Sequence, residues 1–118
     1  MKKIYHLATC STCQRIISEL ELSADIEKQD IKTEKITLAQ LTEMAQLSGS
    51  YESLFSRRAI KYKQLGLQNL QLNEEDYKNY ILEEYTFLKR PVLILNDKIF
   101  IGNSKKTVES AKLALQLN

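Results

Sequence analysis

Near the N-terminus a short strand pattern runs directly into a helical one, and both cysteines of the chain lie at the junction. Residues 3–7 (KIYHL) predict a strand, and over residues 12–22 the apolar positions repeat with a helical period. Small residues form the turn between the two segments. Cys10 is therefore expected just after the strand, at the foot of the helix, and Cys13 about one turn further in.

The remaining patterns predict a helical middle and a C-terminal hairpin followed by a helix. The expected elements are a strand at 26–31, a helix from the capping box at Thr37 to Gly49, one or two short helices over 51–65, a helix over 73–85, strands at 92–95 and 98–101, and a helix after Ser104. The inward positions expected in the last two long helices are Tyr77, Tyr80, Ile81, Val108, Ala111 and Leu115.

This order, β-α-β, then helices, then β-β-α, predicts an α/β fold with a mixed sheet flanked by helices. It is the plan of the thioredoxin fold with a helical insertion, about residues 37–86, between its two halves. No linker rich in Pro, Gly or Ser separates that insertion from the rest. Residues 1–118 are therefore expected to form one domain.

Length and composition narrow the class of protein further. A chain of 118 residues with 43% hydrophobic side chains can bury one core. It has no apolar run long enough to cross a membrane and no signal-peptide pattern, so a cytoplasmic protein without membrane association is expected. The net charge of +2, with lysines spread among acidic residues, gives no reason to expect direct nucleic-acid binding.

The number and spacing of the cysteines indicate redox chemistry. A secreted disulfide scaffold would contain more cysteines, and a zinc site would need two further ligands, for which His6 is the only histidine. No bound metal or cofactor is expected. A helix N-terminus favours the thiolate, and the spacing lets the two sulfur atoms meet. Cys10 is the predicted nucleophile and Cys13 the predicted resolving thiol; the alternative is a pair of inert buried cysteines.

Arginines and the single proline are the other candidates for the site. Pro91 precedes the apolar strand, where it either starts a buried strand or, as in thioredoxin-like folds, is cis and faces the cysteine pair. Arg90, Arg57 and Arg58 suit oxyanions and carboxylates and would favour a thiolate, although solvated surface arginines are the common alternative. His6 lies within the first strand and is expected to be a half-buried structural residue.

Several short motifs, taken in order, resemble the ArsC/Spx family nearly end to end. They are Cys10-Ser11-Thr12-Cys13, Arg57-Arg58 ahead of residues 62–67 (YKQLGL), Lys89-Arg90-Pro91-Val92 and Ile101-Gly102-Asn103. The resemblance implies a thioredoxin-like fold with a helical insertion. In its arsenate reductase branch one cysteine, matched by Cys10, acts with three arginines, two of them matched by Arg90 and by Arg57 or Arg58. The third is expected near Gly102, where this chain has no arginine.

The Spx branch of the family implies a second class of function. Its members are redox-sensing regulators that carry C-x-x-C and bind the alpha subunit of RNA polymerase. We favour a thiol-dependent reductase, of arsenate reductase or thiol–disulfide type, acting on a small thiol or oxyanion substrate. Glutathione, or a glutaredoxin- or thioredoxin-type reductant, would be its co-substrate. The alternative is an Spx-like regulator, and the cysteine pair alone does not distinguish the two.

Overall fold

The computed structural model describes residues 1–117, which divide into two compact units. The first comprises residues 1–35 and 90–117 and contains all the strands named here; the second is Ile36–Lys89. The elements of the first unit are β1 (Lys2–His6), α1 (Ser11–Leu20), β2 (Glu27–Asp30), β3 (Val92–Leu95), β4 (Lys98–Ile101) and α5 (Lys105–Gln116). These are the strands and helices that the sequence predicts for the two halves.

The four strands form one mixed sheet in the order β2-β1-β3-β4. β1 pairs with β2 in parallel, as a β-α-β unit requires, and pairs with β3 in antiparallel fashion. β3 and β4 form the predicted hairpin, whose turn contains Asn96 at φ 59°. The fold is therefore α/β with a mixed sheet, as the sequence predicts. Since β1 is central, the residues that follow it project from the middle of the sheet.

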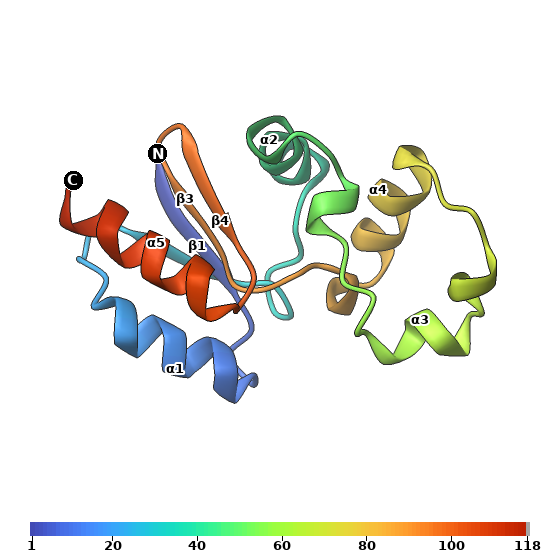
Figure 1. The fold of residues 1–118 in the computed structure, drawn as a ribbon, viewed down its shortest axis with the longest axis horizontal. Helices are drawn as coiled ribbons and strands as arrows, with labels where there is room; N and C mark the ends of the chain where they lie inside the picture. The colour runs from blue at the N-terminus through green and yellow to red at the C-terminus, as the bar shows by residue number, and fades with distance from the viewer. Residues whose placement is uncertain (118) are drawn as a thin grey trace. The chain divides into compact units, whose positions relative to one another are not determined.

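The core of the first unit lies between the sheet and two helices. α1 and α5 lie side by side on the same face of the sheet (Figure 1), and their apolar residues pack against those of β1 and β3. The buried members of this cluster are Ile4, Ile16, Leu20, Ile26, Leu93, Leu95, Val108, Ala111 and Ala114. The packing fixes the start of α1 close to the end of β1, which is where the cysteines lie.

The second unit is helical and contains the segment predicted as an insertion. Its elements are α2 (Leu38–Ser48), η1 (Glu52–Leu54), α3 (Ile60–Gln64), η2 (Leu67–Asn69), α4 (Glu74–Glu83) and η3 (Tyr85–Phe87), where η denotes a 3₁₀ helix. Its core is aromatic: the buried Phe55 ring lies 5.0 Å from Phe87 and 4.9 Å from Tyr77, centroid to centroid. Such pairs add to the hydrophobic contribution of burial.

Side-chain caps define the starts of the two longest helices of this unit. The Thr37 hydroxyl accepts the Gln40 backbone N–H at 3.1 Å, and the Gln40 side chain accepts the Thr37 N–H at 3.1 Å. Asn73 and Asp76 form the same reciprocal pair at the start of α4. Gly49, with φ 99°, ends α2 in the left-handed conformation that glycine adopts without strain. Both helix starts agree with the sequence prediction.

Removing the Thr37 cap is expected to lower the free energy of unfolding by about 1 kcal/mol. The Thr37→Ala change leaves the Gln40 N–H without its acceptor, and urea denaturation measures the result. Gln46→Ala, at an exposed position within the same helix, is the matched control and should shift the free energy by a few tenths of a kcal/mol at most. Equal stability of the two variants would contradict a stabilising role for the cap.

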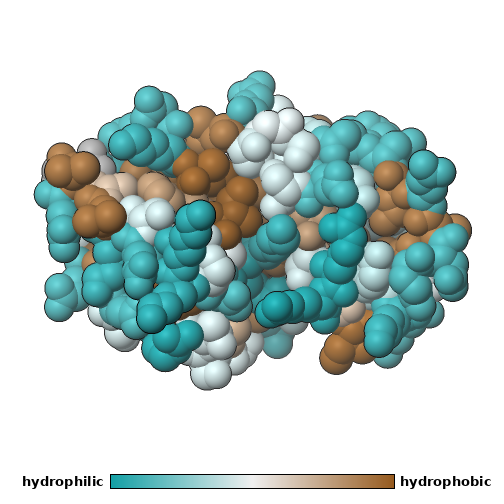
Figure 2. All heavy atoms as spheres, in the orientation of Figure 1, coloured by the Kyte–Doolittle hydropathy of each residue, from teal (hydrophilic) through white to brown (hydrophobic). Residues whose placement is uncertain are grey.

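The surface is predominantly hydrophilic on the face shown in Figure 2, with hydrophobic residues in separate groups between charged ones. This distribution agrees with the interspersed charges of the sequence. No helix within residues 1–117 is long and apolar enough to span a membrane.

Candidate active site

Cys10 occupies the N-cap position of α1. Its backbone is extended, with φ −94° and ψ 112°. Its N–H donates to the Leu7 carbonyl at 3.0 Å, and its carbonyl accepts the Gln14 N–H at 3.1 Å, which is the first hydrogen bond of the helix. The side chain makes no capping hydrogen bond and is half-exposed. The sulfur therefore lies where helix N–H groups converge and where a substrate can reach it.

The surroundings of Cys10 favour its thiolate. Burial is the largest single influence and by itself raises the pKa, but four other influences oppose it. The N–H groups of Cys13 and Thr12, the Cys13 thiol and the positive charge of the Arg90 guanidinium each favour the thiolate. Together they place the pKa of Cys10 below its ordinary value. A lowered pKa increases the thiolate fraction at neutral pH.

Cys13 lies behind Cys10 and has the opposite character. It has no exposed surface, and burial raises its pKa to about 11. The hydrogen bond to Cys10 and the charge of that group raise the pKa further, whereas the Leu7 N–H and Arg90 lower it. Both cysteines are free thiols in the structure. The pair thus combines an accessible, acidic thiol with an enclosed, weakly acidic one.

Iodoacetamide labelling against pH is expected to separate the two thiols. Cys10 should label with an inflection below the ordinary thiol value of about 8.5, because its thiolate is stabilised. Cys13 should remain unlabelled in the folded protein across that range, and should label once the protein is unfolded. Labelling of Cys13 at the rate of Cys10, or a Cys10 inflection at the ordinary value, would contradict the assignment of roles.

Arg90 and Pro91 lie at the cysteine end of the sheet, as predicted. The peptide bond between them is cis. The Gly102 N–H donates to the Pro91 carbonyl at 2.9 Å, and Gly102 has φ 91°, a conformation that L side chains rarely adopt. The charge of Arg90 lowers the pKa of both cysteines. The structure therefore brings Arg90 together with the cysteine pair.

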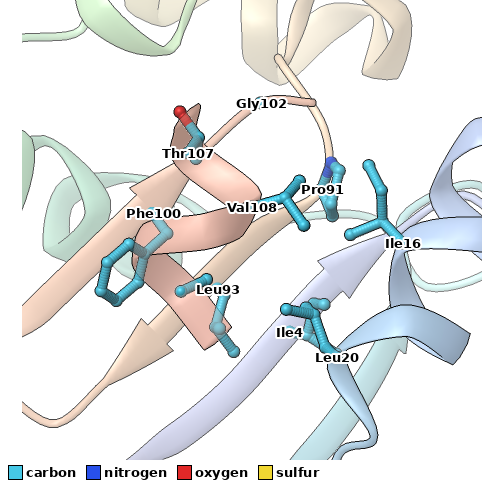
Figure 3. A pocket seen from close by; sticks show the side chains of 10 residues that line it. Ile4, Ile16, Leu20, Pro91, Leu93, Phe100, Gly102, Thr107 and Val108 are labelled. Carbon is cyan, nitrogen blue, oxygen red and sulfur yellow. The ribbon is translucent and has the colours of Figure 1, made fainter. Parts of the chain in front are cut away.

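A small apolar cavity adjoins Pro91. Figure 3 shows the proline between Ile16 of α1 and Val108 of α5, and Thr107 supplies the only hydroxyl in the lining. The cavity has a volume of about 10 Å³, which is room for about one water-sized group. It is a gap between packed elements and is too small for a tripeptide such as glutathione.

Arg57 and Arg58 belong to the second unit, and the Arg57 side chain bonds other side chains of that unit. The Arg57 guanidinium donates to Glu52 Oε2 and to the Tyr77 hydroxyl, both at 2.9 Å, and lies over the rings of Phe55 and Tyr77. Its hydrogen bond to Glu52 is the main cause of its raised pKa. The Arg58 side chain is exposed and has no ion-pair partner among residues 1–117.

His6 and the two residues after Cys13 also have defined positions. His6 is half-buried, as expected; burial lowers its pKa, Asp30 raises it and Lys28 lowers it. Arg15 is exposed and forms an ion pair with Glu19 at 3.8 Å. Among residues 1–117, no three His, Cys, Asp or Glu side chains gather to form a metal site.

The contacts of the Gln14 side chain were not predicted from the sequence. Its side-chain amide donates to the Leu7 carbonyl at 3.0 Å and contacts His6 Nδ1 at 3.2 Å. Its position one turn after Cys10 was the only available signal, because a strand-to-helix contact of this kind depends on the tertiary fold.

The fold and the cysteine pair together define a thioredoxin-like α/β protein with a helical insertion. Comparison with known protein families matches the ArsC family over residues 5–111, and the chain belongs to that family. No curated protein matches the chain.

Solved structures of related proteins match nearly the whole chain. An arsenate reductase from Vibrio cholerae superposes with a TM-score of 0.77 at 19% identity, covering 93% of this chain and 96% of its own. An arsenate reductase (ArsC) related protein from Brucella melitensis gives 0.70 at 22%, covering 92% of each chain. A structure described as "a possible arsenate reductase" from Streptococcus mutans gives 0.68 at 25%, covering 89% and 92%. The first two likenesses show the fold alone.

Proposed function

We propose that this chain is a cytoplasmic thiol-dependent reductase that uses Cys10 as nucleophile and Cys13 as resolving thiol. The observation that carries the proposal is the arrangement of the two sulfur atoms. Half-exposed Cys10 lies at the helix N-cap, where nearby N–H groups and the charge of Arg90 lower its pKa, and the buried Cys13 lies about one turn further into the helix. These are the features that thiolate nucleophiles share.

The substrate class we propose is the mixed disulfide of glutathione with another thiol. The Cys10 thiolate attacks the glutathione sulfur, a Cys10–glutathione disulfide forms, and the other thiol leaves as a thiolate. Cys13 then attacks the Cys10 sulfur, closing the Cys10–Cys13 disulfide and releasing glutathione thiolate. A glutaredoxin- or thioredoxin-type dithiol, or two molecules of glutathione, returns two electrons and restores both thiols.

The surroundings of Cys13 support this order of steps. In the reduced pair, the hydrogen bond to Cys10 and the charge of Cys10 both raise the pKa of Cys13, in addition to burial. Once Cys10 is bonded to glutathione, it carries no thiolate charge, so the charge contribution ends. The resolving thiol therefore becomes easier to ionise after the first step. Attack by Cys13 is in this way delayed until Cys10 has reacted.

Arginine side chains would hold the anionic parts of the substrate. Arg90 is proposed to stabilise the Cys10 thiolate and a nearby carboxylate or oxyanion. Arg57 is less suited than Arg58, because its guanidinium is engaged by Glu52 and Tyr77. Arg58 is exposed and carries no ion pair among residues 1–117.

A turnover assay with a glutathionylated peptide, glutathione and glutaredoxin tests the proposal. It should be run beside a pull-down of the RNA polymerase alpha subunit by the oxidised and the reduced protein. Reduction of the peptide at a rate proportional to protein concentration supports the reductase. No reduction, together with redox-dependent capture of the alpha subunit, would contradict it and favour the Spx-like alternative.

A further inference from the structure

The Gln14 side chain connects α1 to the end of β1. The amide nitrogen Nε2 lies 3.0 Å from the Leu7 carbonyl oxygen and 3.2 Å from His6 Nδ1. The backbone N–H of the same residue donates to the Cys10 carbonyl at 3.1 Å. Gln14 therefore bonds the 7–10 turn twice. Its main chain bonds Cys10, and its side chain bonds Leu7.

Leu7 lies next to both cysteines. Its carbonyl accepts the Cys10 N–H at 3.0 Å, and its N–H, which belongs to the preceding peptide unit, lowers the pKa of Cys13. Leu7 itself is buried. Because Gln14 holds that carbonyl, it restrains the Leu7–Ala8 peptide, which bonds the nucleophile's backbone N–H and is joined through the Leu7 α-carbon to the N–H on the Cys13 side. A shift of this peptide would change the distance between the two sulfur atoms, and disulfide geometry tolerates little change.

The chemistry of the amide makes glutamine specific at this position. One NH₂ group carries two hydrogens, so it can donate to the Leu7 carbonyl and also meet His6 Nδ1. The second contact is a hydrogen bond when the ring is neutral and carries its proton on Nε2. Burial favours that state; Asp30 of β2 opposes it and Lys28 of β2 supports it. A carboxylate in place of the amide would be repelled by the Leu7 carbonyl and would accept a proton from His6.

We propose that Gln14 is a positioning residue that holds the Leu7 peptide so that Cys10 and Cys13 close rapidly into a disulfide. The inference rests on the proposed function only for the identity of the reaction, because closure of the pair can be measured with any two-electron thiol oxidant. The proposed role of Gln14 involves no direct contact with either sulfur. Its effect on reactivity passes through Leu7.

The test uses the full-length protein and the variants Gln14→Ala and Gln14→Glu, with Arg15→Ala as the matched control. Arg15 is the next residue of the same helix, and its side chain is exposed. Reduced protein is mixed with diamide, which takes two electrons and two protons from the pair and becomes the corresponding hydrazine. Acid quenching and mass spectrometry follow the loss of free thiols. Urea denaturation of each variant shows that folded protein is compared.

Both Gln14 variants are expected to close about tenfold more slowly than the parent, since both lose the hydrogen bond to the Leu7 carbonyl. Arg15→Ala should close at the parent rate. Gln14→Glu should also raise the pKa of His6, followed by NMR of its ring protons, because a carboxylate then lies beside the ring; this shift shows that residue 14 still contacts His6 in the variant whose closure is measured. Closure at the parent rate in both Gln14 variants, or equal slowing in Arg15→Ala, overturns the inference. If the Gln14 variants close slowly with diamide but the parent protein reduces no glutathionylated peptide, the proposed function is wrong and the positioning role of Gln14 still holds.

Discussion

Cys10→Ser is expected to reduce turnover of a glutathionylated peptide to the uncatalysed background. A serine hydroxyl neither ionises near neutral pH nor forms a disulfide, so the hydrogen bonds from Thr12 and Cys13 and the charge of Arg90 have no thiolate to stabilise. The measurement is glutathione release, coupled to a glutathione-recycling enzyme. The thiol of Cys13 is buried and weakly acidic and is not expected to substitute.

Ser11→Ala is the matched control for this substitution. Ser11 is exposed and adjoins Cys10 at the first position of α1, and its loss should leave turnover near the parent value. Retention of more than a few per cent of the activity in Cys10→Ser would show that another group carries the reaction.

Arsenate is expected to be a poor substrate for this protein. Resemblance to the arsenate reductase branch implies three arginines around the oxyanion, and the region expected to hold the third contains Gly102 and Asn103. Arg57 is also engaged by Glu52. Removing one preorganised donor from an oxyanion site costs about 10²–10³ in rate. Arsenate turnover coupled to glutathione and glutaredoxin should therefore be lower by about that factor than in an otherwise similar site with all three arginines.

A variant that adds an arginine near Gly102 tests the same point. Gly102 has φ 91°, so an arginine there would be strained. Asn103 is exposed and can accept the change, so Asn103→Arg is the variant of choice and is expected to increase arsenate turnover. Arsenate reduction by the unmodified protein at ordinary enzyme rates, roughly 1 s⁻¹ or more, would mean that three arginines are not needed.

The predictable parts of this fold are those that local sequence determines. The capping residues Thr37 and Asn73 each sit at the observed helix start because their side chains bond backbone N–H groups within the same turn. The C-terminal hairpin follows from an apolar run, a turn and a second strand. The cysteine pair was placed correctly for the same reason, since a strand that ends before Cys10 and a helix that begins after it leave one position for the residue.

Burial was harder to predict wherever long-range packing decides it. Lys3 is 8% exposed because it lies on the strand face of Tyr5, over whose ring its ammonium group sits while it pairs with Glu27 at 2.9 Å. In α5 Val108 and Ala111 are buried as predicted, but the next buried position is Ala114, and Leu115 is only half-buried, because the buried face continues at a spacing of three residues. Tyr80 is likewise half-buried, and touches Phe87 edge-on.

In the site, too, local features were predictable and long-range contacts were not. The positions of Cys10 and Cys13 at the start of α1 were inferred from spacing and agree with the structure, and the charge of Arg90 lowers the pKa of both; the roles of these three residues stay predictions. The contact of Gln14 with Leu7 joins a helix to a strand end, and nothing in the local pattern specifies it. Likewise the Arg57 contacts come from Glu52 and Tyr77, which are 5 and 20 residues away. Such contacts require the packed structure.

The central claim is that Cys10 attacks and Cys13 resolves, and trapping with Cys13→Ser tests it most directly. The variant is mixed with glutathione disulfide, quenched in acid and digested, and the modified peptide is identified by mass spectrometry. Because no resolving thiol remains, we expect one glutathione per protein, stably attached to Cys10. The reciprocal Cys10→Ser variant should remain unmodified on the same timescale. Rapid modification of Cys13 in Cys10→Ser, with Cys10 unmodified in Cys13→Ser, would contradict the account.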